Sequence, residues 1–487
     1  MRGIGTGHSR LVRVLAGGVI LAAAVAGCAS GDDGSFGAEE HQPFRQPPEL
    51  VASNGVLTSK LEVTQGPIQV GGVSVIGKSF NGSFPGPTMV VSPGDTIRLE
   101  LANNLTEPTN IHFHGFHTSP SGIADNVLRT IPAQTTEPVE VPVPTDMPPG
   151  VYWYHSHEHG ISEEQVFSGL SGAIVVRGVE DRLPPELRGV EQRLFALKDA
   201  QVKDGAIVTQ NIDSDDPTTR MVNGLVEPKL GIAPGETQMW RFANIGADIW
   251  YNVSLAGLRF HVIGEDANPV GEVWEATELL LPPGKRYDVL VSGPPPGTYE
   301  LETLAYSTGK AGDSYPERVL ATVESTGRAV EPAVMPLSLG PLPDIPASEV
   351  DVQRTLVFSE SDNGNQFFIN GEQFDPDVVN IEATLGDTEE WTIKNSSEEE
   401  HPFHIHINDF QVISVNGQPY NARSFQDTQA LPAGGEIVIR QRYADFTGSF
   451  VYHCHILAHE DGGMMGVIQV NAPAGSGPAA VPAGTGP

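Results

Sequence analysis

Alternation of apolar and polar residues marks short strands along the chain. A clear case is the run 97–101, where Ile97, Leu99 and Leu101 alternate with Arg98 and Glu100. A period of two places the apolar side chains on one face of a strand and the charged side chains on the other. Glycine and proline, with 54 and 40 of the 487 residues, supply turns between such runs. The pattern predicts an all-β chain.

This strand pattern occurs three times. In each copy a Gly-Asp/Glu-Thr turn precedes the strand, and an asparagine follows nine residues after the glycine, as Gly94 and Asn103, Gly235 and Asn244, and Gly386 and Asn395. A second pattern of glycine followed by alternating aromatic or apolar residues repeats in step, from Gly150, Gly297 and Gly448. The copies lie 141 and 151 residues apart, which is the size of one domain. We expect three successive β domains at 55–180, 181–327 and 328–471.

The two ends of the chain differ in character from these repeats. Residues 1–27 read as an export signal, with Arg2, Arg10 and Arg13 before an apolar run, and Val25-Ala26-Gly27-Cys28 resembles a bacterial lipobox. That resemblance implies cleavage before Cys28 and lipid attachment to its thiol, which would hold the protein on the outer face of the cell membrane. The alternative is an ordinary signal peptide and a periplasmic or extracellular protein. Residues 28–54 are expected to form a flexible tether and 472–487 a disordered tail.

Composition excludes two classes of protein. The formal net charge is −33, with 28 Lys and Arg against 61 Asp and Glu, so a nucleic-acid partner is not expected. The only cysteines are Cys28 and Cys454, which lie in different contexts, so a disulfide framework is not expected either.

Histidines carry the strongest chemical signal. Of 15 histidines, ten fall into four short clusters in the first and third repeats, namely His112 and His114, His155 and His157, His401, His404 and His406, and His453, His455 and His459. A single His-x-His pair is often structural, but four pairs confined to two of three repeats indicate metal ligands. Because side chains at i and i+2 share one face of a strand, each pair directs two imidazoles toward one point.

Cys454 distinguishes the kind of metal site. It lies between His453 and His455, so on a strand it points to the opposite face, and one tripeptide can serve two sites. Cys454, His459 and Met464 follow one another with four residues between each, and with one more histidine they match the ligand set of a blue copper site. Zinc sites require no thioether ligand, so the methionine favours copper over zinc. Met464 also has a simpler interpretation as a core residue.

These motifs resemble the three-domain multicopper oxidases, the family of laccases and bacterial metallo-oxidases. The resemblance extends over roughly 55–471 and includes the segment 81–87, Asn-Gly-Ser-Phe-Pro-Gly-Pro. It implies three consecutive cupredoxin-like Greek-key β-sandwich or barrel domains, with no copper ligand in the middle one. It also implies four copper ions, one of type 1, one of type 2 and two of type 3.

Position by position, the resemblance assigns the ligands as follows. Type 1 copper takes His401, Cys454, His459 and axial Met464, and type 2 copper takes His112 and His404. One type 3 copper takes His114, His157 and His455, and the other takes His155, His406 and His453. The resemblance further implies that a reductant delivers electrons to type 1 copper near His459 or His401, and that Cys454, His453 and His455 carry them to the cluster that reduces O2 to water.

Three acids lie near these motifs. Asp125 and Glu460 match positions that resemble the family's proton-relay acids, and a buried carboxyl can relay protons when its surroundings tune its pKa. Their alternative role is to orient a ligand or to lie in solvent. Asp427 is expected to be structural.

The substrate is less well defined by the sequence. The axial methionine and the absence of a Met-rich insert favour a laccase-like oxidase of phenols and aromatic amines, with O2 as the acceptor. The alternative is a metallo-oxidase for Cu(I), Fe(II) or Mn(II), for which Glu398, Glu399 and Glu400 beside His401 are the candidate residues. A non-enzymatic scaffold on this fold would lack several ligands, and this chain lacks none. A copper nitrite reductase would have two such domains rather than three.

Overall fold

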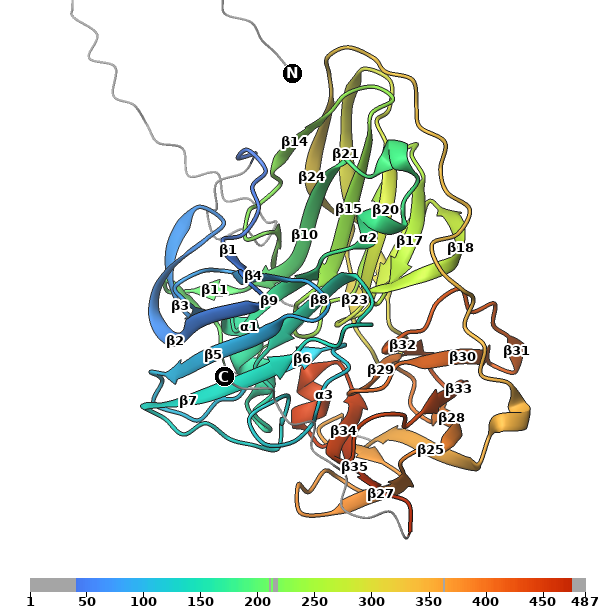
Figure 1. The fold of residues 1–487 in the computed structure, drawn as a ribbon. Helices are drawn as coiled ribbons and strands as arrows, with labels where there is room; N and C mark the ends of the chain where they lie inside the picture. Colours follow the sequence, from blue (N-terminus) through green and yellow to red (C-terminus); the bar gives the residue numbers. More distant parts are fainter. Residues whose placement is uncertain (1–40, 210–211, 213–217, 362–363, 475–487) are drawn as a thin grey trace, which may run out of the picture. The chain divides into compact units, whose positions relative to one another are not determined.

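A computed structural model describes residues 41–209, 212, 218–361 and 364–474. The predicted signal, Cys28 and most of the predicted tail lie outside these residues. The described chain is built almost entirely of strands, which confirms the all-β prediction. Figure 1 colours the successive repeats from blue to cyan, from green to yellow and from orange to red.

The first repeat consists of two sheets. The five-stranded sheet has the order β1 (Glu49–Val51), β4 (Gly86–Val91), β9 (Ser171–Val176), β8 (Gly150–His155) and β6 (His112–His114). The six-stranded sheet has the order β11 (Val202–Lys203), β12 (Ala206–Ile207), β3 (Val73–Phe80), β2 (Val56–Val70), β5 (Thr96–Asn103) and β7 (Thr135–Pro142). Helix α1 (Ser162–Ser168) connects β8 to β9.

The middle repeat also consists of a six-stranded and a five-stranded sheet. Its six-stranded sheet has the order β13 (Thr219–Val222), β10 (Glu191–Ala200), β15 (Thr237–Asn244), β20 (Arg286–Ser292), β17 (Phe260–Glu265) and β18 (Asn268–Ala276). Its five-stranded sheet has the order β14 (Lys229–Ile232), β24 (Arg318–Ser325), β21 (Gly297–Leu304), β16 (Tyr251–Leu255) and β19 (Glu278–Leu281). The short strands β22 (Tyr306–Ser307) and β23 (Ser314–Tyr315) form a separate hairpin, and α2 (Val179–Arg182) and η1 (Pro185–Leu187) precede the repeat.

The third repeat completes the series. Its six-stranded sheet has the order β26 (Phe367–Ile369), β25 (Val352–Glu360), β28 (Thr388–Asn395), β33 (Glu436–Arg442), β30 (Phe410–Val415) and β31 (Gln418–Pro419). Its five-stranded sheet has the order β27 (Val379–Thr384), β35 (Met465–Asn471), β34 (Gly448–Cys454), β29 (His401–Ile405) and β32 (Thr428–Leu431). Turn η2 (Ala347–Glu349) precedes it, and α3 (Leu457–Asp461) connects β34 to β35.

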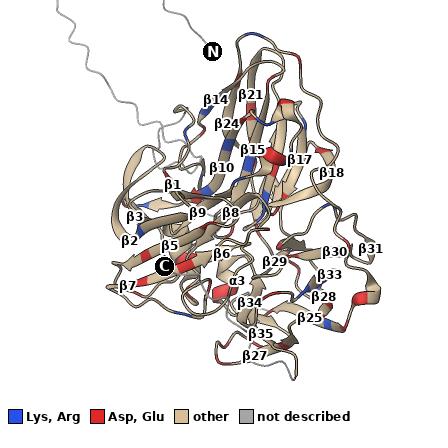
Figure 2. Cartoon of the chain, in the orientation of Figure 1, with Lys and Arg blue, Asp and Glu red and all other residues tan. Residues whose placement is uncertain are grey.

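The larger sheets of the three repeats have four strands in the same order, β3-β2-β5-β7, β13-β10-β15-β20 and β26-β25-β28-β33, with the same pairing directions. The pairs β2–β5, β10–β15 and β25–β28 are parallel, and the next neighbours β7, β20 and β33 pair antiparallel in all three cases. Each repeat also has its own apolar core cluster. On β5, Ile97, Leu99 and Leu101 are buried while Arg98 and Glu100 are exposed, as the alternation predicts. Asp and Glu lie on strands and loops of all three repeats (Figure 2).

Two segments cross the boundaries expected from the sequence. Within the predicted tether, β1 pairs in parallel with β4, and Phe44 donates its backbone N–H to Lys229 O at 2.8 Å. Within the predicted second domain, β12 pairs with β3 of the first repeat, Ala206 opposite Ile76. Both segments are short and irregular in sequence, but they satisfy the backbone groups of strands that would otherwise be sheet edges.

The asparagine that ends each central strand shapes the loop that follows. All three asparagines are buried. Asn395 Nδ2 donates to Glu399 O at 2.6 Å, and Asn395 Oδ1 accepts from the Ser397 N–H at 2.9 Å. This loop leads directly into His401, so the repeat positions the first histidine of the third repeat.

Candidate metal centre

Eight of the predicted histidines meet where the first and third repeats are in contact. Strand pairing accounts for much of this arrangement. On β6 and β8, His112 lies opposite His155, and on β29 and β34, His404 lies opposite His453. The residues between the paired histidines point the other way, since Phe113 and Ile405 lie in the apolar cores of their own repeats. The i, i+2 spacing therefore brings two histidines to one side at each of these strands, the second one lying just past the end of β8, β29 and β34.

The eight imidazoles form three groups, each with ligand atoms within 4.8 Å of one another. The groups are His112, His114 and His404, then His114, His155 and His455, and finally His157, His406 and His453. The second and third groups differ from the type 3 division implied by the resemblance, which exchanges His155 and His157. The register of β6 and β8 places His155 opposite His112, while His157 lies beyond the end of β8, where its Nε2 is 3.3 Å from His453 Nε2.

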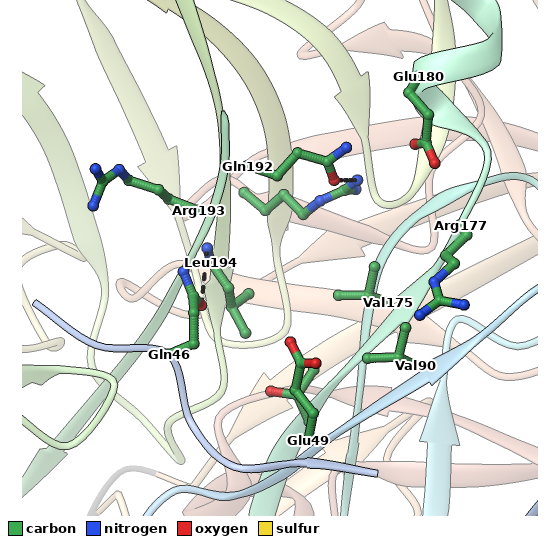
Figure 3. A pocket seen from close by; sticks show the side chains of 11 residues that line it. Gln46, Glu49, Val90, Val175, Arg177, Glu180, Gln192, Arg193 and Leu194 are labelled. Carbon is green, nitrogen blue, oxygen red and sulfur yellow. Dashed lines mark hydrogen bonds between the residues drawn. The ribbon is translucent and has the colours of Figure 1, made fainter. Parts of the chain in front are cut away.

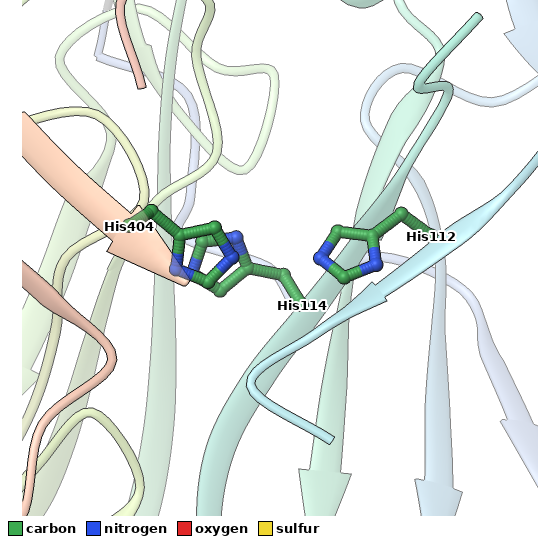
Figure 4. Close-up of side chains that lie close together, drawn as sticks. All are labelled: His112, His114 and His404. Atoms are coloured by element: carbon green, nitrogen blue, oxygen red, sulfur yellow. The ribbon is translucent and has the colours of Figure 1, made fainter. Parts of the chain in front are cut away.

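Two pairs of rings stack across the repeats. His114 on β6 stacks on His404 on β29 with ring centroids 3.8 Å apart, and His112 stacks on His406 at 3.7 Å. Figure 4 shows the His114 and His404 rings overlapping beside the ring of His112. The site therefore depends on contact between the first and third repeats.

The outer ring nitrogens are held by hydrogen bonds. His112 Nδ1 lies 3.0 Å from Asp125 Oδ1, and His114 Nε2 lies 3.0 Å from Asp427 Oδ1. His404 Nδ1 donates to the Asp427 carbonyl at 2.8 Å. In the same way, His155 and His453 donate from Nδ1 to the carbonyls of the residues that follow them. Such partners fix the tautomer and the ring orientation, so the opposite nitrogen can act as a ligand.

The inner nitrogens face one another without a proton donor. Nε2 of His112, His155 and His404 is buried and has no hydrogen-bond partner among the described residues. His453 Nε2 lies 3.3 Å from His157 Nε2 and 3.2 Å from His406 Nε2. Burial lowers the pKa of all eight imidazoles, so they are neutral at pH 7. Neutral imidazoles with converging lone pairs fit transition-metal ions of the copper kind.

A second candidate site lies on the opposite face of β34. Cys454 Sγ lies 3.6 Å from His401 Nδ1 and 3.7 Å from His459 Nδ1, and the two nitrogens are 3.2 Å apart. Met464 is fully buried, and its backbone bonds to both Cys454 and His459. Burial raises the pKa of the Cys454 thiol, so a thiolate at this position requires a cation. A thiolate with two imidazoles, and with Met464 in the same apolar core cluster as Cys454, fits a blue copper site.

The two predicted relay acids both contact the histidine cluster. Asp125 is buried, and burial raises the pKa of its carboxyl to about 8, although the Phe113 N–H hydrogen bond opposes the shift. Glu460 is also buried, and its carboxylate lies 3.1 Å from His453 Nδ1 and 3.4 Å from His157 Nδ1. Ser162 Oγ donates to Glu460 at 3.0 Å. Both acids are therefore placed to orient histidines and to hold a proton.

Sequence reasoning missed Glu360 and Arg286, gave Asp427 only a structural role, and named Glu399 only as a candidate for metal oxidation. Asp427, expected to be structural, bonds His114 and is itself bonded by Arg286 of the middle repeat. Glu360 lies 3.0 Å from His401 Nε2, and Glu399 lies 3.7 Å from His459 Nε2. Only Glu399 belongs to the acidic run that the sequence singled out. Arg286 and Glu360 carry no local signal, because they are far from every histidine motif in the sequence.

A cavity elsewhere in the chain does not share this chemistry. It has a volume of about 260 Å³ and is lined by residues of the first and middle repeats (Figure 3). Some of its polar groups bond to one another, since Arg241 donates to Gln192 at 2.9 Å and the Leu194 N–H donates to Gln46 at 3.3 Å. None of the clustered histidines lines it.

Comparison with known proteins agrees with this geometry. Three family models, each described as multicopper oxidase, match residues 62–181, 191–325 and 347–474. The chain belongs to the multicopper oxidase family. This multicopper oxidase is 28% identical over 404 residues to a multicopper oxidase of Staphylococcus haemolyticus, covering 80% of this chain and 83% of the relative.

Two solved structures are similar over most of their length. A multicopper oxidase from Campylobacter jejuni, described as a metallo-oxidase, is 27% identical, with a TM-score of 0.78, and the match covers 89% of this chain and 96% of that one. A laccase from Pediococcus acidilactici is 25% identical, with a TM-score of 0.78, and the match covers 89% and 94%.

Membership of the family confirms several predictions. This multicopper oxidase is an oxidoreductase that uses copper, with O2 and a reducing substrate as its reactants. The three cupredoxin domains correspond to the three repeats of paired sheets. Among helices in the described part of the chain, none is long and apolar enough to cross a membrane.

Proposed function

We propose that the protein is a laccase-like oxidase that holds four copper ions and couples one-electron oxidation of phenols or aromatic amines to four-electron reduction of O2 to water. The observation that carries this proposal is the pairing of two complete donor sets across one strand. His453 and His455 face the eight-histidine cluster, and Cys454 between them faces His401 and His459. A single residue thus links the two sites covalently.

The donor sets suggest how the ions are distributed. The type 1 site takes His401, Cys454, His459 and axial Met464, and the type 2 site takes His112 and His404. For the type 3 pair, the convergence of nitrogens favours His114, His155 and His455 for one ion and His157, His406 and His453 for the other. When bound, copper supplies the one-electron redox chemistry that these side chains lack.

The chain's own residues have three roles in this reaction. His459 is the entry point for electrons, because its side chain is 11% exposed, whereas His401 is fully buried behind Glu360 and Ser397. Phe367 stacks on the His459 ring at 4.1 Å and shields one of its faces. Asp125 and Glu460 hold protons at carboxyl oxygens that lie beside cluster histidines, where water formation consumes them.

Oxidation of a metal ion is the second candidate, and the acids beside the type 1 histidines favour it. Glu398 is exposed and paired with Lys310 at 2.7 Å, and Glu400 accepts from the Tyr306 hydroxyl at 2.6 Å. Both are therefore engaged by the β22–β23 hairpin. Glu399 instead lies near His459 Nε2, and burial raises the pKa of its carboxyl to about 8. A cation at Glu399 would lie next to the entry point for electrons.

Oxygen uptake by the copper-loaded protein distinguishes these substrates. An electron-rich phenol is compared with Cu(I), Fe(II) and Mn(II), and Glu399→Gln is compared with Glu398→Gln as a matched control. We expect rapid uptake with the phenol and little effect of either substitution. Uptake mainly with one metal ion, lost in Glu399→Gln and kept in Glu398→Gln, would establish the metallo-oxidase instead. Retained uptake in Cys454→Ser would refute the oxidase itself.

We further propose that the protein is exported and lipid-anchored through Cys28. The support is the lipobox-like segment 25–28 after a basic and apolar leader. Mass spectrometry of the mature amino terminus tests this proposal. A diacylglyceryl Cys28 at the first position is expected, and an unmodified terminus at another residue would refute it.

A further inference from the structure

The middle repeat supplies no proposed copper ligand, yet one of its loops touches the histidine cluster. Gly284 precedes β20 and has φ near +87°. A β-carbon at this position would lie 3.0 Å from His114 Cε1 and 3.1 Å from His455 Cδ2. Because Gly284 approaches these two histidines closely, the next residues of the chain, Lys285 and Arg286, lie near the histidine cluster.

Arg286 connects all three repeats. Its Nη1 donates to Asp427 Oδ1 at 2.7 Å, and its Nη2 donates to Asp427 Oδ2 at 2.6 Å, so the pair with the third repeat is bidentate. Its Nε donates to the Val151 carbonyl of the first repeat at 3.3 Å. The side chain of Arg286 is 0% exposed and that of Asp427 is 2% exposed. A planar guanidinium matches both carboxylate oxygens in a way that a lysine ammonium cannot.

Asp427 in turn holds the outer nitrogens of two histidines. Its carboxylate lies 3.0 Å from His114 Nε2, and its backbone carbonyl accepts from His404 Nδ1 at 2.8 Å. The Asp427 segment is fixed from below as well, since Asp266 Oδ2 accepts from the backbone N–H groups of Asp427 and Thr428 at 3.3 and 3.2 Å. Asp266 belongs to the middle repeat, which therefore binds this segment through two residues, Arg286 and Asp266.

The consequence for His114 follows from hydrogen-bond chemistry. A carboxylate accepts only, so it requires the proton of His114 on Nε2 and leaves the lone pair on Nδ1, which lies 3.2 Å from His455 Nε2. Without the guanidinium, Asp427 would be a buried carboxylate without its principal counter-charge, and it would rotate or take up a proton. In either case the constraint on His114 would be lost.

We propose that Arg286 is a positioning residue of the histidine cluster, which acts through Asp427 so that His114 presents Nδ1 and His404 presents Nε2 to the metal. This inference rests on the copper cluster of the proposed function. It gives the middle repeat a role in the cluster although it supplies no ligand. The competing interpretation is a purely structural ion pair that only holds the repeats together.

The chain offers a matched control for the structural interpretation. Arg241 and Asp288 form another buried pair in the middle repeat, with Arg241 Nη1 donating to Asp288 Oδ1 at 2.9 Å and side-chain exposures of 3% and 1%. Neither residue contacts a cluster histidine in the described structure. Replacement of Arg241 by lysine therefore perturbs a buried pair of the same kind away from the ligands.

The experiment compares Arg286→Lys, Arg286→Met and Arg241→Lys in the full-length copper-loaded protein. Copper per chain, the electron paramagnetic resonance signal, the near-ultraviolet absorption of the paired ions and the thermal midpoint of the metal-free protein are measured alongside kcat and KM. We expect Arg286→Lys to lower copper affinity of the cluster or kcat by 10- to 100-fold, and Arg286→Met to lower it further. The blue absorption and KM for the phenol should stay unchanged, because the site of Cys454 and His459 lies beyond the opposite face of β34.

The outcomes separate the possible failures. Arg241→Lys should lower the thermal midpoint comparably but keep its copper and its cluster spectrum. Equal copper retention and equal spectra in Arg286→Lys and Arg241→Lys would overturn the inference alone, leaving Arg286 a structural residue. Wild-type protein that binds no copper at the cluster would overturn the proposed function and this inference together. If Arg286→Met does not fold, the comparison of Arg286→Lys with Arg241→Lys still distinguishes a positioning role of Arg286 from a structural one.

Discussion

An asparagine ends the central strand of each repeat, and the asparagines of the third and middle repeats, Asn395 and Asn244, provide a matched pair of substitutions. We expect the two substitutions to lower stability alike but to differ in their effect on function. Asn395 Nδ2 donates to the carbonyls of Glu399 and Leu431 at 2.6 and 3.5 Å, and Asn395 Oδ1 accepts from the Ser397 N–H. Its counterpart Asn244 lies in the ligand-free middle repeat. Alanine at either position removes these bonds and leaves buried backbone groups unpartnered.

The expected loss of stability can be worked out from the bonds. Asn244 donates to the carbonyls of Ile249 and Leu281 at 2.8 and 3.0 Å, and it accepts from the Gly246 N–H at 3.2 Å. Three backbone groups lose a bond in either variant, and each buried group left without a partner costs about 1–3 kcal/mol, so the loss is roughly 3–9 kcal/mol in either variant. We therefore expect Asn395→Ala and Asn244→Ala to lower the thermal midpoint of the metal-free protein by similar amounts.

The two variants should differ in colour. Ser397 Oγ donates to Asn395 Oδ1 and lies 2.9 Å from His401 Nε2, so Asn395 supports the group that orients a proposed type 1 ligand. Asn244 supports no histidine in this way. Copper-loaded Asn395→Ala should show a weakened or shifted blue absorption, and Asn244→Ala should not.

Calorimetry of the metal-free proteins and absorption spectroscopy of the copper-loaded proteins make the comparison. Because three domains unfold together or separately, the shift in midpoint is compared between variants rather than converted to a free energy. If Asn395→Ala is destabilised but keeps an unchanged blue absorption, the loop from Asn395 to His401 does not set the ligand geometry, and the reasoning fails.

Three further predictions concern the cluster and its surroundings. Gly284→Ala should reduce copper bound at the cluster without removing the blue absorption, because its β-carbon would press on His114 and His455; copper analysis that shows full occupancy would contradict this. Burial raises the pKa of Asp409 to about 7, above its unfolded value, so between about pH 4 and 7 the folded protein binds a proton that the unfolded protein has released. The free energy of unfolding of the wild type should therefore fall as the pH rises through this range, by up to about 1.4 kcal/mol per pH unit. Denaturation of Asp409→Asn across this range should show a weaker dependence, and identical slopes would refute the assignment. Removal of copper by a chelator should lower the thermal midpoint of wild type more than that of Cys454→Ser, since the variant lacks one site; equal shifts would contradict a metal site at Cys454.

Local sequence patterns determined the fold class, the number of repeats and the histidines that gather. Alternation in the run 97–101 fixed which side chains of β5 are buried, because strand periodicity depends only on neighbours in the sequence. The same rule predicted that the Cys454 side chain points to the other face of its strand from those of His453 and His455. The resemblance then named the family, which the comparisons confirm.

Only the tertiary structure decided which histidines share a group and what surrounds them. The packing of the first repeat against the third grouped His155 with His114 and His455, and sequence spacing carries no information on which side chains meet between domains. Arg286 and Asp427 became neighbours of the cluster because Gly284 allows a loop of the middle repeat to pass against His114. Contacts of this kind join residues more than a hundred positions apart, and they follow from the packing of three domains rather than from any local pattern.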